Sequence, residues 1–243
     1  MRADPSRLAA HVAALAGPRH RQAAQALAQA EAYIARALGA LGLDVDQPPF
    51  PFAGAVYRNV VGTMVGADPA RPRLLIGAHF DTVPNTPGAD DNASGVAALL
   101  EAARVLAQDR LAATVEFVGF NLEEPQGVRY RVGSHAYAQA ARHRGVQYAG
   151  ALILEMVGYT DARPGSQRVP ALLFWKRVPQ SGTFLAATGD GRSASLLRGS
   201  LTRRAAPLRI CPSSPSARHG VGGSCSTPAC PTTRRSGTAA TLH

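Results

Sequence analysis

Short apolar runs that alternate with helix-forming stretches constrain the fold of this chain more than any other sequence feature. The runs Leu74–Ala78, Thr114–Phe120 and Ala151–Met156 have the length of buried strands and are bounded by turn residues. Apolar residues at helical spacing fill the two gaps between them, at Val96–Leu106 and Ser134–Arg144. Because strands joined by helices form parallel sheets covered on both faces, this order predicts a three-layer α/β fold with a mostly parallel twisted sheet.

The N-terminal part of the chain adds helices to this plan, and further strands are expected on either side of the core. Alanine-rich helices are predicted over about 6–16 and 22–41, the first of them ending at Gly17-Pro18. An extended segment is expected at 45–52. Additional strands are predicted at 59–65, 171–175 and 183–187.

The positive charge of the chain is concentrated at one end. The 243 residues carry 26 basic and 16 acidic groups, and residues 199–243 hold six arginines, all three cysteines and no acid. Prolines among Ser, Thr and Arg without apolar periodicity predict a disordered basic tail there, after a folded domain over 1–198. Lys176 is the only lysine, which indicates a coding bias rather than a nucleic-acid surface, so no nucleic-acid partner is expected.

Two further absences in the sequence bear on location. No apolar run approaches the roughly 18 residues that a membrane-spanning helix needs. The N-terminus carries charges at Arg2, Asp4 and Arg7 and lacks the apolar core of a signal peptide. These features predict a cytoplasmic protein without a membrane partner. The sequence does not indicate the oligomeric state.

Polar groups stand where the predicted strands end. His79 and Asp81 follow the first run, Glu123-Glu124 follow the second, and Glu155 lies within the third. Asp90-Asp91-Asn92 precede the helix at 96–106. Because open α/β sheets form their sites at the carboxyl ends of strands, these groups are expected to converge.

One histidine with several carboxylates suits zinc above other metals. An alternating strand end directs His79 and Asp81 to the same side, so Asp81 can accept the second imidazole N–H. Of Glu123-Glu124, one can bind metal while the other acts as general base. Each group alone also fits an ordinary role: a core histidine, a solvated loop, or an acidic helix cap. Their combination at strand ends favours a metal site.

Several motifs resemble peptidase family M28, whose members are zinc-dependent exopeptidases with an aminopeptidase branch. The resemblance covers about residues 20–198. It rests on segments that follow the family order: Gly77–Val83, Pro87–Gly95, Glu123-Glu124, Gly133–Ala138 and Leu154–Tyr159.

The resemblance implies a role for each matching residue. One zinc ion would be held by His79 and Glu155, a second by Glu124, and Asp91 would bridge the two. Glu123 would be the general base and Asp81 the residue that orients the histidine. The implied reaction is removal of N-terminal residues from a peptide with a free N-terminus, by a dizinc-activated water. Two alternatives are a non-catalytic fragment that binds at most one metal, and a related dizinc carboxypeptidase or amide deacylase.

The tail also departs from the family pattern, in which the second zinc needs a histidine near the C-terminus. After Glu155 the chain has only His219 and His243, in other contexts. Read one base out of phase with suitable synonymous codons, Cys225–His243 encodes a string with Ser-Asp-His-Ala-Pro-Phe-Trp, which resembles the segment before that ligand. We therefore expect an out-of-frame tail, a sheet incomplete at the C-terminus, one zinc or fewer, and little or no activity in this chain.

Overall fold

The computed structural model describes residues 2–125, 129–166, 179–190 and 193, all within one compact unit that spans Met1–Thr202. Its first part comprises helices α1 (Pro5–Leu15) and α2 (Ala24–Gly39) and strands β1 (Asp44–Asp46), β2 (Pro49–Phe52), β3 (Ala55–Arg58) and β4 (Val60–Met64). Its second part comprises β5 (Arg73–His79), the π-helical turn η1 (Ala89–Ser94), α3 (Gly95–Leu106), β6 (Val115–Phe120), α4 (Val132–His143) and β7 (Tyr148–Ile153).

The central sheet has five strands in the order β1-β4-β6-β5-β7. Strands β6, β5 and β7 run parallel, β4 pairs antiparallel with β6, and β1 pairs antiparallel with β4, so the sheet is mixed with a parallel half. His79 pairs with Phe120 at the carboxyl ends of β5 and β6, and Gly77 pairs with Ile153 at the end of β7. The segments that follow these three strands therefore leave the same edge of the sheet.

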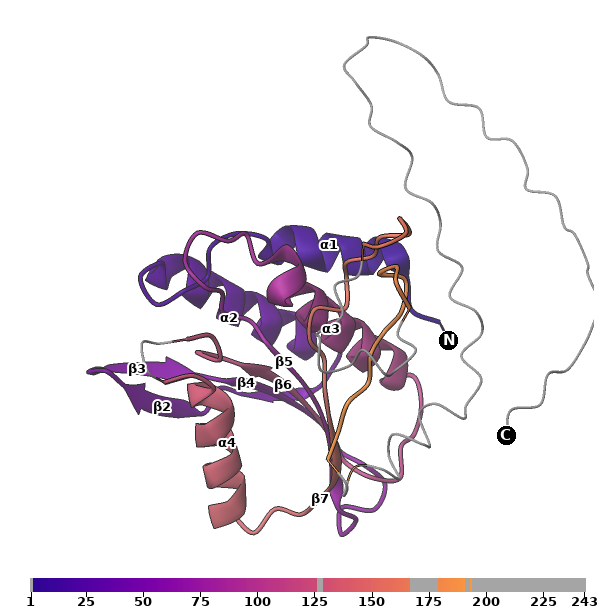
Figure 1. The fold of residues 1–243 in the computed structure, drawn as a ribbon. Coiled ribbons are helices and arrows are strands. Elements are labelled where there is room, and N and C mark those ends of the chain that lie inside the picture. The colour runs from indigo at the N-terminus through magenta and orange to yellow at the C-terminus, as the bar shows by residue number, and fades with distance from the viewer. Residues whose placement is uncertain (1, 126–128, 167–178, 191–192, 194–243) are drawn as a thin grey trace, which may run out of the picture. The chain divides into compact units, whose positions relative to one another are not determined.

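Helices cover both faces of the sheet, as Figure 1 shows, with α1, α2 and α3 on one side and α4 on the other. The larger core lies under the first three helices and includes Ile34, Leu38, Phe80, Leu99 and Phe117. A smaller core lies under α4 and contains Val61, Leu75, Val118, Phe120 and Tyr137. Strand β6 is buried along its whole length because it contributes to both cores.

The predicted helices and core strands are confirmed with small changes in their bounds. The strand expected at 151–156 begins earlier and ends at Ile153, so Glu155 lies in the following loop rather than within a strand. The strand predicted at 183–187 is wrong. Only a bridge between Asp161 and Gly182 forms near it, and Leu185 is 69% exposed, so no buried face selects a strand there. The extended segment at 45–52 resolves into β1 and β2, and β2 forms a hairpin with β3.

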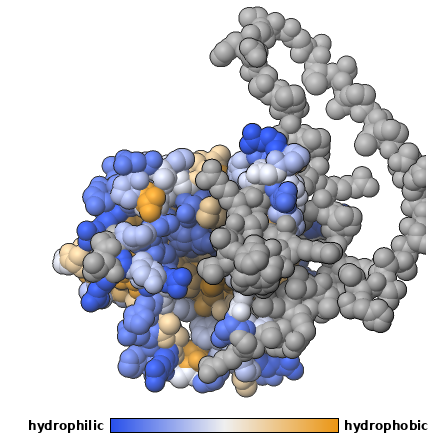
Figure 2. All heavy atoms as spheres, in the orientation of Figure 1, coloured by the Kyte–Doolittle hydropathy of each residue, from blue (hydrophilic) through white to orange (hydrophobic). Residues whose placement is uncertain are grey.

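Several predictions fall outside the described residues. These are the strand at 171–175, the domain boundary at 198 and the basic tail. Within the described residues, no helix combines the length and apolar character that crossing a membrane requires. In the view of Figure 2 the coloured surface is mostly hydrophilic, with hydrophobic residues gathered toward the middle of the face.

Candidate metal centre

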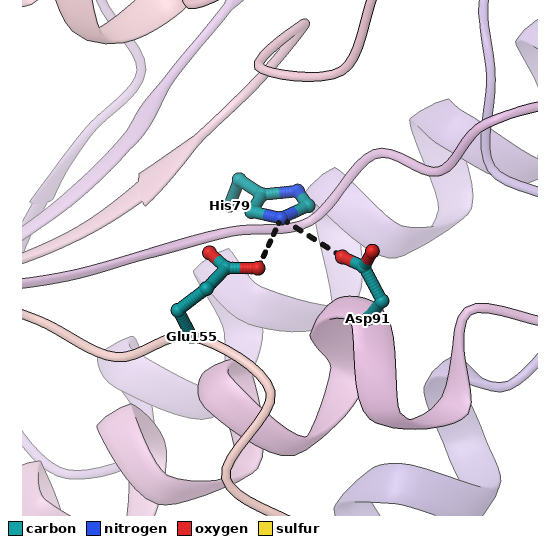
Figure 3. A group of neighbouring side chains, drawn as sticks. All are labelled: His79, Asp91 and Glu155. Atoms are coloured by element: carbon teal, nitrogen blue, oxygen red, sulfur yellow. Dashed lines mark hydrogen bonds and ion pairs between the residues drawn. The ribbon is translucent and has the colours of Figure 1, made fainter. Parts of the chain in front are cut away.

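His79 stands at the centre of a group of acidic side chains (Figure 3). It is the last residue of β5, and its Nε2 atom lies 3.2 Å from Asp91 Oδ1 and 3.3 Å from Glu155 Oε1. The imidazole is buried at 8% exposure, whereas the side chains of Asp91 and Glu155 are 42% and 50% exposed. The cluster is thus anchored in the fold on the histidine side and open to solvent on the carboxylate side.

Asp91 lies between His79 and a second carboxylate. Glu124 Oε1 is 4.0 Å from His79 Nε2, and Glu124 is also close enough to Asp91 for a side-chain hydrogen bond. Burial, followed by the charge of Asp91, raises the pKa of Glu124 to about 7. Asp91 is therefore close to both His79 and Glu124.

Asp81 holds the loop that carries the two glutamates. It is fully buried, and its carboxylate oxygens accept hydrogen bonds from the backbone N–H groups of Glu123 and Glu124 at 3.0 and 3.1 Å. The expected contact with the histidine is longer, because Asp81 Oδ1 lies 3.5 Å from His79 Nδ1 and the backbone oxygen of Asp81 lies 3.2 Å from it. Asp81 thus orders the glutamate loop as well as flanking the imidazole.

The imidazole is biased toward its protonated form by its neighbours. Burial acts to lower the pKa of His79, but hydrogen bonds and charges from Asp81 and Glu155 outweigh it and raise that pKa to about 10. A metal ion would have to displace this proton, because histidine binds metal through a neutral ring nitrogen.

Glu123 points toward the start of α4. Its two carboxylate oxygens accept hydrogen bonds from the backbone N–H of Ser134 at 2.6 Å and from the Ser134 hydroxyl at 2.7 Å. Burial raises the pKa of Glu123, and these hydrogen bonds limit the rise. The carboxylate that the sequence predicts to be free of metal is therefore fixed in orientation by a residue that sequence reasoning did not assign.

A ladder of side chains from η1 holds the loop that contains Glu155. Asn92 Oδ1 accepts the backbone N–H of Met156, Ser94 Oγ accepts that of Val157, and Asp90 Oδ1 accepts those of Gly158 and Tyr159. Asn92 Nδ2 also donates to Glu155 Oε2 at 3.3 Å. In this segment, the sequence predicted a ligand role for Asp91 and no positioning role for Asp90, Asn92 or Ser94. The spacing of polar side chains at alternate positions, 90, 92 and 94, is the signal that this prediction missed.

The donor set fits zinc. His79, Asp91 and Glu155 each offer one ligand atom, and these three atoms all lie within 4.8 Å of one another. A single ion could contact all three. Asp91 Oδ1 is buried and, among the described residues, accepts no hydrogen bond of normal geometry, although such an atom ordinarily has a partner. Three protein ligands drawn from histidine and carboxylate, with one side open to solvent, follow the three-ligand pattern of catalytic zinc sites.

Comparison with known proteins agrees with this geometry. Residues 59–175 match the model described as Peptidase family M28. The Escherichia coli (strain K12) protein YfbL is 36% identical over 174 residues, which cover 68% of this chain and 53% of YfbL. The chain thus spans about half the length of this relative.

Solved structures share the fold. A leucine aminopeptidase precursor from Bacteroides thetaiotaomicron VPI-5482 superimposes with a TM-score of 0.57 at 23% identity, covering 68% of this chain and 65% of that one. A Zn-dependent exopeptidase from Parabacteroides distasonis ATCC 8503 gives 0.51 at 27% identity, with coverages of 64% and 61%. The glutaminyl cyclase of Porphyromonas gingivalis gives 0.55 at 25% identity, with coverages of 65% and 58%.

Proposed function

We propose that this chain, whose residues 59–175 belong to peptidase family M28, acts as a zinc-dependent exopeptidase that removes N-terminal residues from peptides. The observation that carries the proposal is the convergence of His79, Asp91 and Glu155 on one point at the carboxyl edge of the sheet. The chain is of zinc metallopeptidase lineage. What we propose is its aminopeptidase specificity and its substrate, a peptide with a free N-terminus.

In this proposal His79, Asp91 and Glu155 hold one zinc ion, and the fourth position faces solvent. The bound metal would polarise the scissile carbonyl and lower the pKa of the attacking water. Glu124 and Asp91 offer two carboxylates for a second ion. Without a further imidazole, they would hold it weakly, so we expect one zinc ion or fewer in this chain.

Glu123 is proposed as the general base. Ser134 occupies one acceptor position on each of its oxygens, and a carboxylate oxygen has a second lone pair available. Glu123 takes a proton from the attacking water on that lone pair and delivers it to the departing amine. Its raised pKa suits this exchange, since a base with a pKa nearer the working pH both accepts and returns the proton.

The test is hydrolysis of leucyl p-nitroanilide by the purified, zinc-supplemented full chain, beside the N-acetylated form of the same substrate. We expect slow turnover, of the free amine only, because the second metal position lacks its imidazole, and loss of that turnover when a chelator is added. Turnover of the acetylated form would indicate an amide deacylase, and release of C-terminal residues from a blocked peptide would indicate a carboxypeptidase. Cyclisation of a peptide with an N-terminal glutamine is assayed as a further alternative reaction, because the fold is shared with a glutaminyl cyclase. A folded, zinc-bound protein inactive on every substrate would overturn the proposal in favour of a non-catalytic protein.

A further inference from the structure

Arg19 is a buried cation in the connection between α1 and α2, outside the residues that match the family model. It is 3% exposed. Its Nε donates to the carbonyl of Phe80 at 2.8 Å, and its Nη2 donates to the carbonyl of Gly88 at 2.9 Å. Its Nη1 donates to the carbonyls of Leu15, Gly17 and Pro87. One guanidinium thus joins the N-terminal connection to two segments of the metal centre.

Those two segments carry ligands. Phe80 lies between His79 and Asp81, and Gly88 is the residue before η1, which contains Asp91. The backbone of Arg19 adds to the attachment, because its N–H donates to Thr82 Oγ1 at 2.9 Å and its carbonyl accepts the N–H of Thr82 at 3.0 Å. Arg19 therefore sets the separation between the end of β5 and the start of η1.

The turn at Gly88 is built around this guanidinium. Gly88 has a φ of +56°, and a Cβ there would lie 2.2 Å from Thr82 Cγ2 and 2.8 Å from Arg19 Nη2. Only glycine fits such a position without displacing its neighbours. The close packing means that a shorter or differently shaped cation cannot make the same set of hydrogen bonds.

The charge of Arg19 also bears on the acidic cluster. Burial lowers the pKa of Arg19 to about 10, and the carboxylates of Asp81 and Asp91 act in the opposite direction. The side chain therefore stays charged at neutral pH. Because its hydrogen bonds go to carbonyls, its positive charge remains available to offset neighbouring carboxylates before a metal arrives.

We infer that Arg19 is a positioning residue of the metal centre, which fixes His79 and Asp91 at the distance that zinc requires. The inference rests on the metal centre of the proposed function and not on its substrate. Residues that orient metal ligands from outside typically change metal affinity by about 10–100-fold when they are altered.

The experiment compares zinc affinity, by competition with a chromophoric chelator, in the full chain and in Arg19→Gln and Arg19→Lys. Arg19→Gln removes the charge and most of the hydrogen bonds, and we expect its zinc affinity to fall about 10–100-fold. Arg19→Lys loses the fork of donors but keeps an N–H group that can donate to some of the same carbonyls, so its affinity should fall less. Circular dichroism of each variant reports whether it is folded.

The matched control is Arg104→Gln. Arg104 is also a poorly exposed arginine of the helical layer, and it pairs with the buried Glu101 on α3 at 2.7 Å. Its loss should reduce stability and leave zinc affinity unchanged.

Should Arg19→Gln fail to fold, Thr82→Val tests the same attachment by removing one hydrogen bond, with a smaller expected loss of zinc affinity. The inference would be overturned if folded Arg19→Gln binds zinc within twofold of the wild-type affinity. If Arg19→Gln does not fold, the same result in Thr82→Val would overturn it. None of these readouts requires peptidase activity, so a failure of the proposed reaction would be seen separately.

Discussion

Asn92 accepts the backbone N–H of Met156 at 3.1 Å, and this contact joins the turn that carries Asp91 to the loop that carries Glu155. The same side-chain oxygen accepts the N–H of Gly95 at 3.1 Å, and the amide nitrogen donates to the carbonyl of Leu154 at 2.9 Å. Asn92 is fully buried. Two proposed metal ligands, Asp91 and Glu155, that lie far apart in the sequence are therefore held together by one amide.

Substitution of this amide should loosen the metal centre. Asn92→Asp keeps the accepting oxygen but loses the donor to Leu154 and places a charge beside Glu155. We expect zinc affinity to fall by about 10–100-fold, with a loss of about 1–3 kcal/mol in the free energy of unfolding from the unpaired buried groups. Isothermal calorimetry with zinc and urea unfolding measure the two quantities. Wild-type zinc affinity in a folded Asn92→Asp would show that the ladder does not position Glu155.

Glu123→Gln tests the general base. Glutamine has nearly the shape of glutamate but cannot accept the proton of the water, so kcat should fall by about 10²–10⁴-fold. Zinc content should not change, because Glu123 is not among the three clustered ligands. Steady-state kinetics with leucyl p-nitroanilide and metal analysis of the same preparation give both numbers. Near-normal turnover with full zinc would remove Glu123 from the mechanism.

Ser134→Ala tests whether the serine sets the pKa of that base. The Ser134 hydroxyl donates to Glu123 Oε2 and favours its charged form, so removal of the hydroxyl should raise the pKa of Glu123 further. Because the base works when deprotonated, the acidic limb of the kcat/KM profile should move to higher pH. An unshifted limb would mean that Glu123 does not control the profile.

Glu116 offers a separate test of the fold, on the α4 face of the sheet. Burial acts to raise its pKa, but hydrogen bonds from Tyr137, Tyr148 and Arg73 bring that pKa below its ordinary value of 4.5. A lowered folded-state pKa stabilises the folded protein above the unfolded-state pKa, and the contribution is lost as pH falls through the folded-state value. Glu116→Gln should thus cost about 1.5–3 kcal/mol at neutral pH.

The difference in unfolding free energy between wild type and Glu116→Gln should shrink as pH falls below 4.5. Urea unfolding at a series of pH values measures it. A difference that stays constant with pH would indicate that the carboxylate contributes by shape alone.

The sequence predicted the parts of this protein that depend on local pattern. Apolar runs of strand length located β5, β6 and β7, and the polar groups after them identified His79 and the carboxylates around it. The spurious strand at 183–187 arose because an apolar run does not reveal whether a partner strand lies beside it. The antiparallel pairing of β4 with β6 was not predicted either, because strand order depends on contacts between distant segments.

The residues that hold the ligands were harder to find. Arg19 and Asn92 donate to the backbone carbonyls of Phe80 and Leu154, which are 61 and 62 positions away in the sequence. Ser134 donates to the side-chain carboxylate of Glu123, which is 11 positions away. Apart from the alternating polar residues 90, 92 and 94, no spacing in the sequence indicates these contacts. The proposed metal ligands are recognisable by their chemistry, whereas the residues proposed to position them carry a weaker signal or none.

The most direct test of the central claim is a zinc titration of the metal-free protein, with Asp91→Asn set beside Asp90→Asn. Asp91 Oδ1 faces His79, whereas Asp90 Oδ1 accepts the backbone N–H groups of Gly158 and Tyr159, which an asparagine oxygen can also accept. We predict that wild type and Asp90→Asn bind zinc at one saturable site, and that Asp91→Asn, folded by circular dichroism, loses that binding. Equal zinc binding by Asp91→Asn and wild type would contradict the assignment of the metal centre.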